Sequence, residues 1–236
     1  MTSNAVIHRV TALDLVVEAW PWPWAAAERA RIDAHFAKRQ QEKPGIWNGR
    51  VLVARNADFS EGRLSASYFE TDFASFLAWR DWGFPDRTVF NGFGMGALRS
   101  SDGAFVLGEM GGTTVNAGRI YFPGGTPDPE DVADGRLDID NNIARELEEE
   151  TGLTAADYRP APHRDCVVFG ASVAIVRLLD VDMAGEALQA RIEANLARQE
   201  HPELSGIHLV RTRSDFRASM PLFVTAFLEQ ELGGQR

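Results

Sequence analysis

Residues 145–153, with the sequence Arg-Glu-Leu-Glu-Glu-Glu-Thr-Gly-Leu, constrain this chain of 236 residues more than any other segment. On a helix that turns by about 100° per residue, Glu146 and Glu150 lie one turn apart on one face, and Glu149 lies beside them. Gly152 predicts the end of this helix, because glycine readily adopts the left-handed backbone that closes a helix. The segment therefore predicts a helix that brings three carboxylates together.

Three carboxylates so close to one another need a neutralising partner, because each negative charge raises the pKa of the others. Oxygen ligands of this kind suit a hard divalent ion such as Mg2+ or Mn2+. Arg145 can pair with Glu149 one turn later and hold it in place. The alternative is an exposed acidic helix face, but the arginine, the glycine stop and the upstream pair Gly124-Gly125 favour a metal site.

These residues resemble the second half of the Nudix box, whose pattern Arg-Glu-apolar-any-Glu-Glu-any-Gly-apolar is filled here at every specified position. Residues 120–125, Ile-Tyr-Phe-Pro-Gly-Gly, are similar to the strand and turn that lead into that box. The resemblance implies that Glu146, Glu149 and Glu150 bind the metal, that the carbonyl of Gly124 adds a ligand, and that Arg145 belongs to the catalytic group.

The first half of the box departs from the family pattern. Asp131 stands where the family has a glutamate that orients the box arginine or the catalytic water, and the resemblance makes Asp131 its candidate replacement. About six extra residues follow within residues 132–140, and we expect them to form a substrate-side or structural loop, since the entropy of loop closure grows only slowly with length. The box helix itself is unaffected by this insertion.

The resemblance also implies the fold, an α/β (α+β) structure in which a Nudix-type mixed sheet lies between helices as an α/β/α sandwich. We expect an N-terminal α+β extension in residues 1–88 and the Nudix hydrolase domain in residues 89–236. The hydrophobic periodicity agrees with mixed structure, and Asp72 is a candidate helix cap. It predicts helices at residues 25–38, 72–80, 186–198 and 221–232, strands at 50–54, 64–69, 93–98, 104–107, 165–179 and 207–211, and a turn at 56–62.

The activity that the resemblance implies is metal-dependent hydrolysis of the pyrophosphate bond in a small-molecule nucleoside diphosphate linked to another group. Residues 47–50, Trp-Asn-Gly-Arg, are similar to a segment of the UDP-sugar-hydrolysing members, which also have an N-terminal extension and a long box loop. A nucleotide sugar is therefore the first candidate substrate, with Asn48, Arg119 and Asp131 as substrate-binding residues.

The general base is left open by the sequence. Glu203, in the segment Glu-Leu-Ser-Gly, resembles a late glutamate that lies near the metal in those relatives, and Glu200 is its rival. Glu146, Glu149 and Glu203 are the alternatives for the residue that takes the proton of the water, because a general base is identified by geometry first.

Two other functions compete with the first candidate. Residues 118–125 resemble the end of the coenzyme A diphosphatase signature, but Glu109 and Thr114 stand where its arginines would be, so a coenzyme A or ADP-ribose diphosphatase ranks second. A non-catalytic nucleotide-ligand sensor on a Nudix scaffold is the alternative of another class, suggested by Asp131 and the enlarged loop.

Composition excludes several partners. A net charge of −10 disfavours nucleic acid, which needs a basic surface, and the longest apolar run, residues 167–176, is too short to cross a membrane. One cysteine, Cys166, and the lack of a signal peptide at the start indicate a cytoplasmic protein, with Cys166 buried rather than reactive. Residues 20–24, Trp-Pro-Trp-Pro-Trp, are expected to pack on the sheet or on a partner subunit in preference to stacking on a nucleobase, so a homodimer is one of the expected possibilities.

Overall fold

The computed structural model describes residues 5–112 and 114–234. Its strands are β1 (Val6–Val10), β2 (Ala12–Val17), β3 (Arg50–Ser60), β4 (Arg63–Asp72), β5 (Val89–Arg99), β6 (Phe105–Met110), β7 (Ile120–Tyr121), β8 (Val132–Ala133), β9 (Arg136–Leu137), β10 (Arg159–Pro160), β11 (Arg164–Phe169), β12 (Ser172–Asp180) and β13 (Leu204–Val210). Its helices are α1 (Pro23–Ala27), α2 (Arg29–Glu42), α3 (Phe73–Asp81), α4 (Ile139–Thr151), α5 (Gly185–Leu196) and α6 (Leu222–Gly233), with short 3-10 turns at Pro129–Asp131 and Arg213–Asp215.

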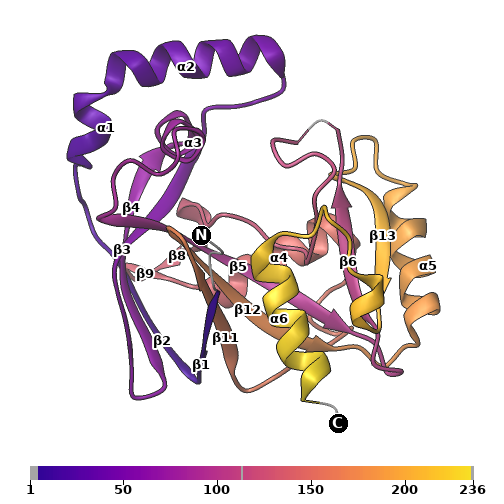
Figure 1. Ribbon diagram of the computed structural model, residues 1–236. Helices are drawn as coiled ribbons and strands as arrows, with labels where there is room; N and C mark the ends of the chain where they lie inside the picture. The colour runs from indigo at the N-terminus through magenta and orange to yellow at the C-terminus, as the bar shows by residue number, and fades with distance from the viewer. Residues whose placement is uncertain (1–4, 113, 235–236) are drawn as a thin grey trace.

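The strands form a mixed sheet in the order β1-β11-β12-β5-β3-β4-β2-β9-β8, and β6, β7, β10 and β13 attach to it. Around its C-terminal half, helices lie on both faces (Figure 1). Ile143 of α4 and Leu188 of α5 share one buried cluster, whereas Phe227 of α6 packs with Met95 of β5 in another. The predicted mixed-sheet α/β architecture is thus confirmed.

The N-terminal extension consists of β2, β3 and β4 with α1, α2 and α3 above them (Figure 1). Its core is aromatic: Trp22 is 3% exposed, and its ring lies 5.6 Å from Phe69 and 5.9 Å from Trp79. The indole N–H of Trp22 donates to Asp86 at 2.9 Å. The tryptophan-rich segment therefore packs within the chain: Pro23 and Trp24 begin α1, and the ring of Trp22 fills the space between the sheet and α3.

The two halves of the molecule are joined through β5, which changes partner along its length. Its first residues pair with β3, through Ala54 and Phe90, and residues 91–99 then run parallel to β12. The predicted boundary between residues 88 and 89 falls at the start of this strand and remains a prediction. Strand β1 crosses that division, since it pairs with β11 of the C-terminal half.

The insertion in the Nudix-like box forms a small hairpin. Strands β8 and β9 pair around Asp134 and Gly135, whose φ angles are 51° and 72°. Arg136 of β9 pairs with Val16 of β2, and Leu137 is buried. The extra residues therefore extend the sheet of the N-terminal extension. Of the two expectations for this loop, a substrate-side role and a structural role, this pairing agrees with the structural one.

Several local predictions are confirmed and others need correction. Asp72 caps α3 by accepting a hydrogen bond from the N–H of Ser75 at 2.9 Å, and Cys166 is buried. The expected helix at residues 25–38 is two helices, α1 and α2. The expected turn at residues 56–62 is mostly strand, because Asn56, with φ 58°, forms an irregularity within β3 instead of ending it. Within the described residues, no helix combines the length and hydrophobicity needed to cross a bilayer.

Candidate metal and nucleotide site

Helix α4 holds the acidic residues because both of its ends and one face are fixed. Asp138 accepts a hydrogen bond from the N–H of Asn141 at 3.0 Å and so caps the first turn. Gly152 ends the helix with φ 73°, as the sequence predicted. Ile143 and Leu147 are buried and dock the helix on the sheet. Glu146 and Glu150, which neighbour these residues in sequence, therefore lie beside this contact.

Strand β5 receives α4 because residues 91–96 alternate as Asn-Gly-Phe-Gly-Met-Gly. A Cβ atom at Gly94 would lie 2.7 Å from Cγ1 of Ile143, and one at Gly96 would lie 2.9 Å from Cδ1 of Leu179. Side chains alternate between the two faces of a strand, so Gly94 and Gly96 leave room for Ile143 of α4 while the larger side chains point to the opposite face. This alternation is a sequence pattern that could have located the site wall, and the sequence interpretation missed it.

The turn of Gly124 and Gly125 lies between β5 and the glutamates of α4. A Cβ at Gly124, where φ is 155°, would lie 2.2 Å from the carbonyl oxygen of Gly94. A Cβ at Gly125 would lie 2.5 Å from the carboxyl carbon of Glu146. The N–H of Gly124 donates to Oε2 of Glu150 at 3.2 Å. Backbone and carboxylates therefore meet at a distance that only glycine permits.

The glutamates at this turn carry unusual proton affinities. Burial raises the pKa of Glu146 to about 7, opposed by the charge of Arg145 and assisted by the charge of Glu149. Burial, followed by the charges of Glu146 and Glu203, raises the pKa of Glu150 well above its ordinary value. Burial likewise raises the pKa of Glu203, which β13 brings to the same place. The cluster thus has more carboxylate charge than nearby cationic charge.

Arg145 organises the outer side of the cluster. Its Nη2 atom lies 3.1 Å from Oδ2 of Asp131, and its Nη1 atom lies 3.0 Å from Glu146 and 3.5 Å from Glu149. The Asp131 side chain is 0% exposed and also accepts a hydrogen bond from Nδ2 of Asn142 at 2.9 Å. Asn142, Arg145 and the N–H of Asp128 all donate to Asp131, which in turn fixes the guanidinium of Arg145.

The oxygen ligands suit a hard cation, although the carboxylates do not form a complete coordination site. Among residues 5–112 and 114–234, no three His, Cys, Asp or Glu side chains are grouped closely enough to hold a metal ion. Glu146 and Glu150 meet at the glycine turn, whereas Glu149 is 59% exposed and turned toward Arg145. Buried carboxylates with raised pKa values and only one adjacent arginine lack a counter-charge, which Mg2+ or Mn2+ would supply through oxygen ligands. The residues therefore fit the expected metal.

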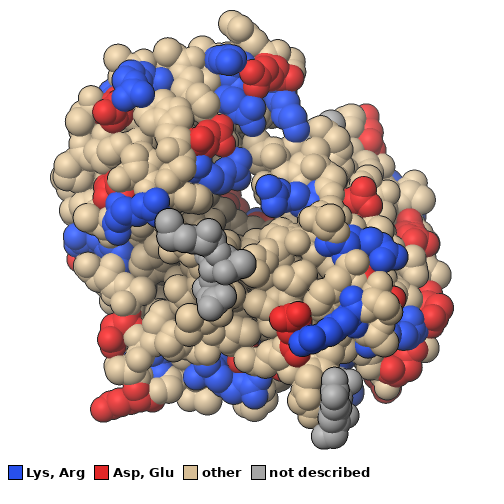
Figure 2. Space-filling view, viewed as in Figure 1, with Lys and Arg blue, Asp and Glu red and all other residues tan. Residues whose placement is uncertain are grey.

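A cavity of about 610 Å³ opens beside this turn, between the extension and the C-terminal half. Figure 2 shows that this face of the molecule is hollowed between the two parts, with basic side chains on both sides of the hollow. The volume is within the range of sites for small molecules. The cavity is lined by Arg39, Phe76, Arg80, Asp81, Phe84, Asn91, Phe93, Met95, Val115, Asn116, Arg119, Tyr121, Gly124, Gly125, Thr126, Phe169, Ser172, Pro221, Leu222 and Phe223.

The box glutamates do not line this cavity; the glycine turn separates them from it. Tyr121 connects the two regions: it lines the cavity, and burial followed by the charges of Glu150 and Glu203 raises its pKa, with a hydrogen bond from Asn116 opposing the shift. The cavity and the acidic cluster are thus adjacent spaces that meet at the turn of Gly124 and Gly125.

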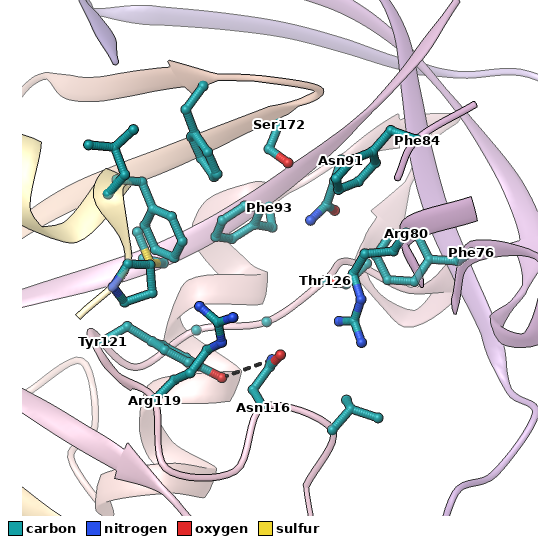
Figure 3. A pocket seen from close by; sticks show the side chains of 18 of the residues that line it. Phe76, Arg80, Phe84, Asn91, Phe93, Asn116, Arg119, Tyr121, Thr126 and Ser172 are labelled. Atoms are coloured by element: carbon teal, nitrogen blue, oxygen red, sulfur yellow. Dashed lines mark hydrogen bonds between the residues drawn. The ribbon is translucent and has the colours of Figure 1, made fainter. Parts of the chain in front are cut away.

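The cavity wall is cationic near the turn. Arg80 of α3 and Arg119, which precedes β7, point into the cavity from different walls (Figure 3). Burial lowers the pKa of Arg80, Asp81 opposes this shift, and the positive charges of Arg39 and Arg119 add to it. The carboxylate of Asp81 lies 3.7 Å from Nε of Arg80 and 3.4 Å from Nε of Arg39, so a single carboxylate pairs with both guanidinium groups. Such a wall favours an anionic ligand.

A lysine connects the extension to the opposite rim of the cavity. Nζ of Lys43, which follows α2, donates to the carbonyl oxygen of Gly112 at 3.4 Å and to that of Thr114. The loop after β6 carries Val115 and Asn116 into the cavity lining. The extension therefore helps to position both sides of the cavity.

The structure brings most of the sequence-predicted site residues together. Glu146 and Glu150 contact the turn of Gly124, and the charge of Glu203 raises the pKa of Glu150. Arg145 links Glu146 to Asp131 and Glu149, and Arg119 lies in the cavity wall. Asn48 lies elsewhere: its Oδ1 accepts a hydrogen bond from the N–H of Ala74 at 2.8 Å at the start of α3. Glu200, the rival of Glu203, has a side chain that is 92% exposed. Arg80 and Asn91 were missed, since neither stands in a motif.

Comparisons with known proteins concern the fold. No protein-family model matches the chain, and no curated protein matches it. Among solved structures, it is similar to the MutT protein from Methanosarcina mazei Go1, with 18% identity and a TM-score of 0.40 over 62% of this chain and 96% of that one. It is also similar to RenU, a Nudix hydrolase from M. smegmatis, with 14% identity and a TM-score of 0.39 over 61% and 86%. A third is the C-terminal domain of mouse MUTYH, from its complex with human PCNA, with 13% identity and a TM-score of 0.36 over 61% and 88%.

Proposed function

We propose that this chain is a Nudix-type hydrolase that cleaves the pyrophosphate bond of a nucleoside diphosphate linked to another group, with Mg2+ or Mn2+ as its cofactor. The observation that carries the proposal is the contact between the turn of Gly124 and Gly125 and the carboxylates of Glu146 and Glu150. Buried acids beside a backbone turn that also lines a cationic cavity suit a metal-assisted reaction on a phosphorylated ligand.

The metal would be held by Glu146, Glu149 and Glu150, with the carbonyl of Gly124 as a further ligand. When bound, such an ion neutralises phosphate oxygens and lowers the pKa of water. Arg145 keeps Glu146 and Glu149 on the same side of α4, through ion pairs of 3.0 and 3.5 Å. Supporting groups of this kind are needed because a ligand displaced by an ångström loses much of its effect.

We infer that Asp131 fulfils the role of the glutamate missing from the box. Its buried carboxylate holds Arg145 at 3.1 Å and is itself held by Asn142. The shorter side chain reaches the arginine because the 3-10 turn Pro129–Asp131 carries it toward α4, where Asp131 accepts a hydrogen bond from the N–H of Asp128 at 3.1 Å. The substitution therefore preserves the support of the arginine.

The substrate that we propose first is a nucleotide sugar, above all a UDP-hexose. Arg80 and Arg119 point into the cavity and would neutralise phosphate oxygens on the side remote from the glutamates. The extension supplies Arg80 and part of the aromatic wall, so it belongs to the substrate site. Asn48 is not among the contacts that we propose, because its side chain is engaged at the start of α3.

A substrate panel with product analysis tests the proposal. UDP-glucose, ADP-ribose, coenzyme A and deoxynucleoside triphosphates are incubated with Mg2+ and, separately, with excess chelator. UMP and glucose 1-phosphate, formed only with the metal, are the expected products. Formation of 3′,5′-ADP and phosphopantetheine would replace the nucleotide sugar by coenzyme A. If several compounds stabilise the protein and none is cleaved, the chain is a sensor and the proposed hydrolysis is wrong.

A further inference from the structure

One end of the cavity differs from the cationic part near the glycine turn. Its walls are aromatic: the rings of Phe93 and Phe223 are 5.4 Å apart at nearly right angles, and Phe169 stacks on Phe223 at 4.9 Å. Phe84 lines the cavity from the extension. Apolar rings on walls from both halves of the molecule favour a flat, apolar group between them.

The polar side chains at this end are few, and one of their atoms lacks a partner. Oδ1 of Asn91 is shielded from solvent and accepts no hydrogen bond from the residues that the structure describes. Ser172 lies opposite Asn91 in the parallel pairing of β12 with β5, and both side chains line the cavity (Figure 3). A buried amide oxygen without a partner is costly, so a ligand that supplies a donor would recover the lost hydrogen bond.

Strand β5 gives the distance between this end and the glycine turn. Gly94 contacts Gly124, and Asn91 precedes Gly94 by three residues, which corresponds to about 10 Å along a strand. A nucleoside 5′-phosphate extends over a comparable length from its phosphorus to the pairing edge of its base, so a nucleotide whose phosphates lie at the turn places that edge beside Asn91.

We propose that the aromatic end of the cavity binds the nucleobase of the substrate and that Asn91 recognises the edge of the base through a donor and an acceptor of its amide. The inference rests on the proposed function, and it names the part of the substrate that the end of the cavity selects. Each base carries a donor next to an acceptor on its pairing edge, which an amide matches with two hydrogen bonds.

A hexose fits this end poorly. Asp81 is the one carboxylate in the described lining of the cavity, and it pairs with arginines near the other end. A sugar has several hydroxyl groups that would lose their hydrogen bonds to water among phenylalanine rings, whereas a base stacks on such rings at little cost. The sugar is therefore assigned to the open side of the glycine turn.

Metal-free binding measurements test this inference without relying on catalysis. The affinities of UMP, AMP and ribose 5-phosphate are measured by calorimetry with excess chelator. Ribose 5-phosphate, which lacks a base, is expected to bind the wild-type protein about tenfold or more weakly than the better of the two nucleotides.

The matched variants are Asn91→Leu, which keeps the size of the side chain, and Arg119→Met. Asn91→Leu should weaken the better nucleotide about tenfold and leave ribose 5-phosphate unchanged, with an unaltered or higher melting temperature because a buried unpaired oxygen is removed. Arg119→Met should weaken both ligands, because both carry a phosphate.

Equal affinities for nucleotide and ribose 5-phosphate, or an equal loss of both in Asn91→Leu, would overturn the base subsite. Neither result would contradict the proposed hydrolysis, because that reaction depends on the metal and on the glutamates of α4. Conversely, base-dependent binding with no cleavage of any panel member would retain the subsite and refute the enzyme.

Discussion

The closest structural test of the metal site is the replacement Gly125→Ala. The new Cβ would lie 2.5 Å from the carboxyl carbon of Glu146 and 2.6 Å from each of its oxygens, whereas ordinary contacts begin at 3.4 Å. The carboxylate is the free end of a flexible side chain, so it should move by about 1 Å while the backbone stays in place. A displacement of this size in a catalytic group costs about a hundredfold in turnover.

The assay compares kcat and the Mg2+ concentration for half-maximal activity with those of Gly45→Ala. No atom lies within 4 Å of a Cβ at Gly45, so both variants should gain the same small stability, about 0.4–1 kcal/mol, from a less flexible unfolded chain. We expect Gly125→Ala to melt at the same temperature as Gly45→Ala and to lose activity at low Mg2+. Activity and metal dependence within about twofold of Gly45→Ala would refute the idea that Glu146 must approach this turn.

Three further outcomes are expected. Asp131→Asn should lower the free energy of unfolding in urea by about 1–3 kcal/mol, because the buried amide no longer balances the charge of Arg145. An unchanged urea midpoint would show that the pair of Asp131 and Arg145 does not stabilise the fold. Shortening the hairpin of β8 and β9 should lower the melting temperature and leave KM unchanged, since no hairpin residue is in the described cavity lining; a raised KM with an unchanged melting temperature would assign the hairpin to the substrate side. Trp22→Ala should cost about 3–5 kcal/mol, because it empties the aromatic core around Trp79; a loss below about 1 kcal/mol by calorimetry would contradict that packing.

The sequence predicted the features that depend on neighbouring residues. Helix α4 ends at Gly152 and α3 begins after Asp72, as local capping rules require. The pairing of strands that are distant in the sequence could not be predicted in this way. The insertion was expected to be substrate-side or structural, and the sequence did not identify its partner: Arg136 pairs with Val16, a contact between segments more than a hundred residues apart that no local pattern encodes.

The candidate site shows the same division between local and distant determinants. Glu146, Glu149 and Glu150 lie within one turn of a helix, so their spacing alone placed them on one side. Arg80 and Asn91 enter the cavity from an extension helix and a central strand, and the fold brings them together. Asn48 was assigned to the substrate by resemblance, although the structure uses its amide to bind the N–H of Ala74.

The most direct test of the account is the turnover of Glu150→Gln with saturating Mg2+ on the substrate that the panel identifies. The substitution keeps the shape of a side chain that is buried at the glycine turn and removes its charge. We predict that kcat falls at least about a hundredfold while the folded state remains intact by circular dichroism. Glu149→Gln should behave similarly. Unchanged turnover in both variants, with the metal still required, would contradict the assignment of α4 as the catalytic helix.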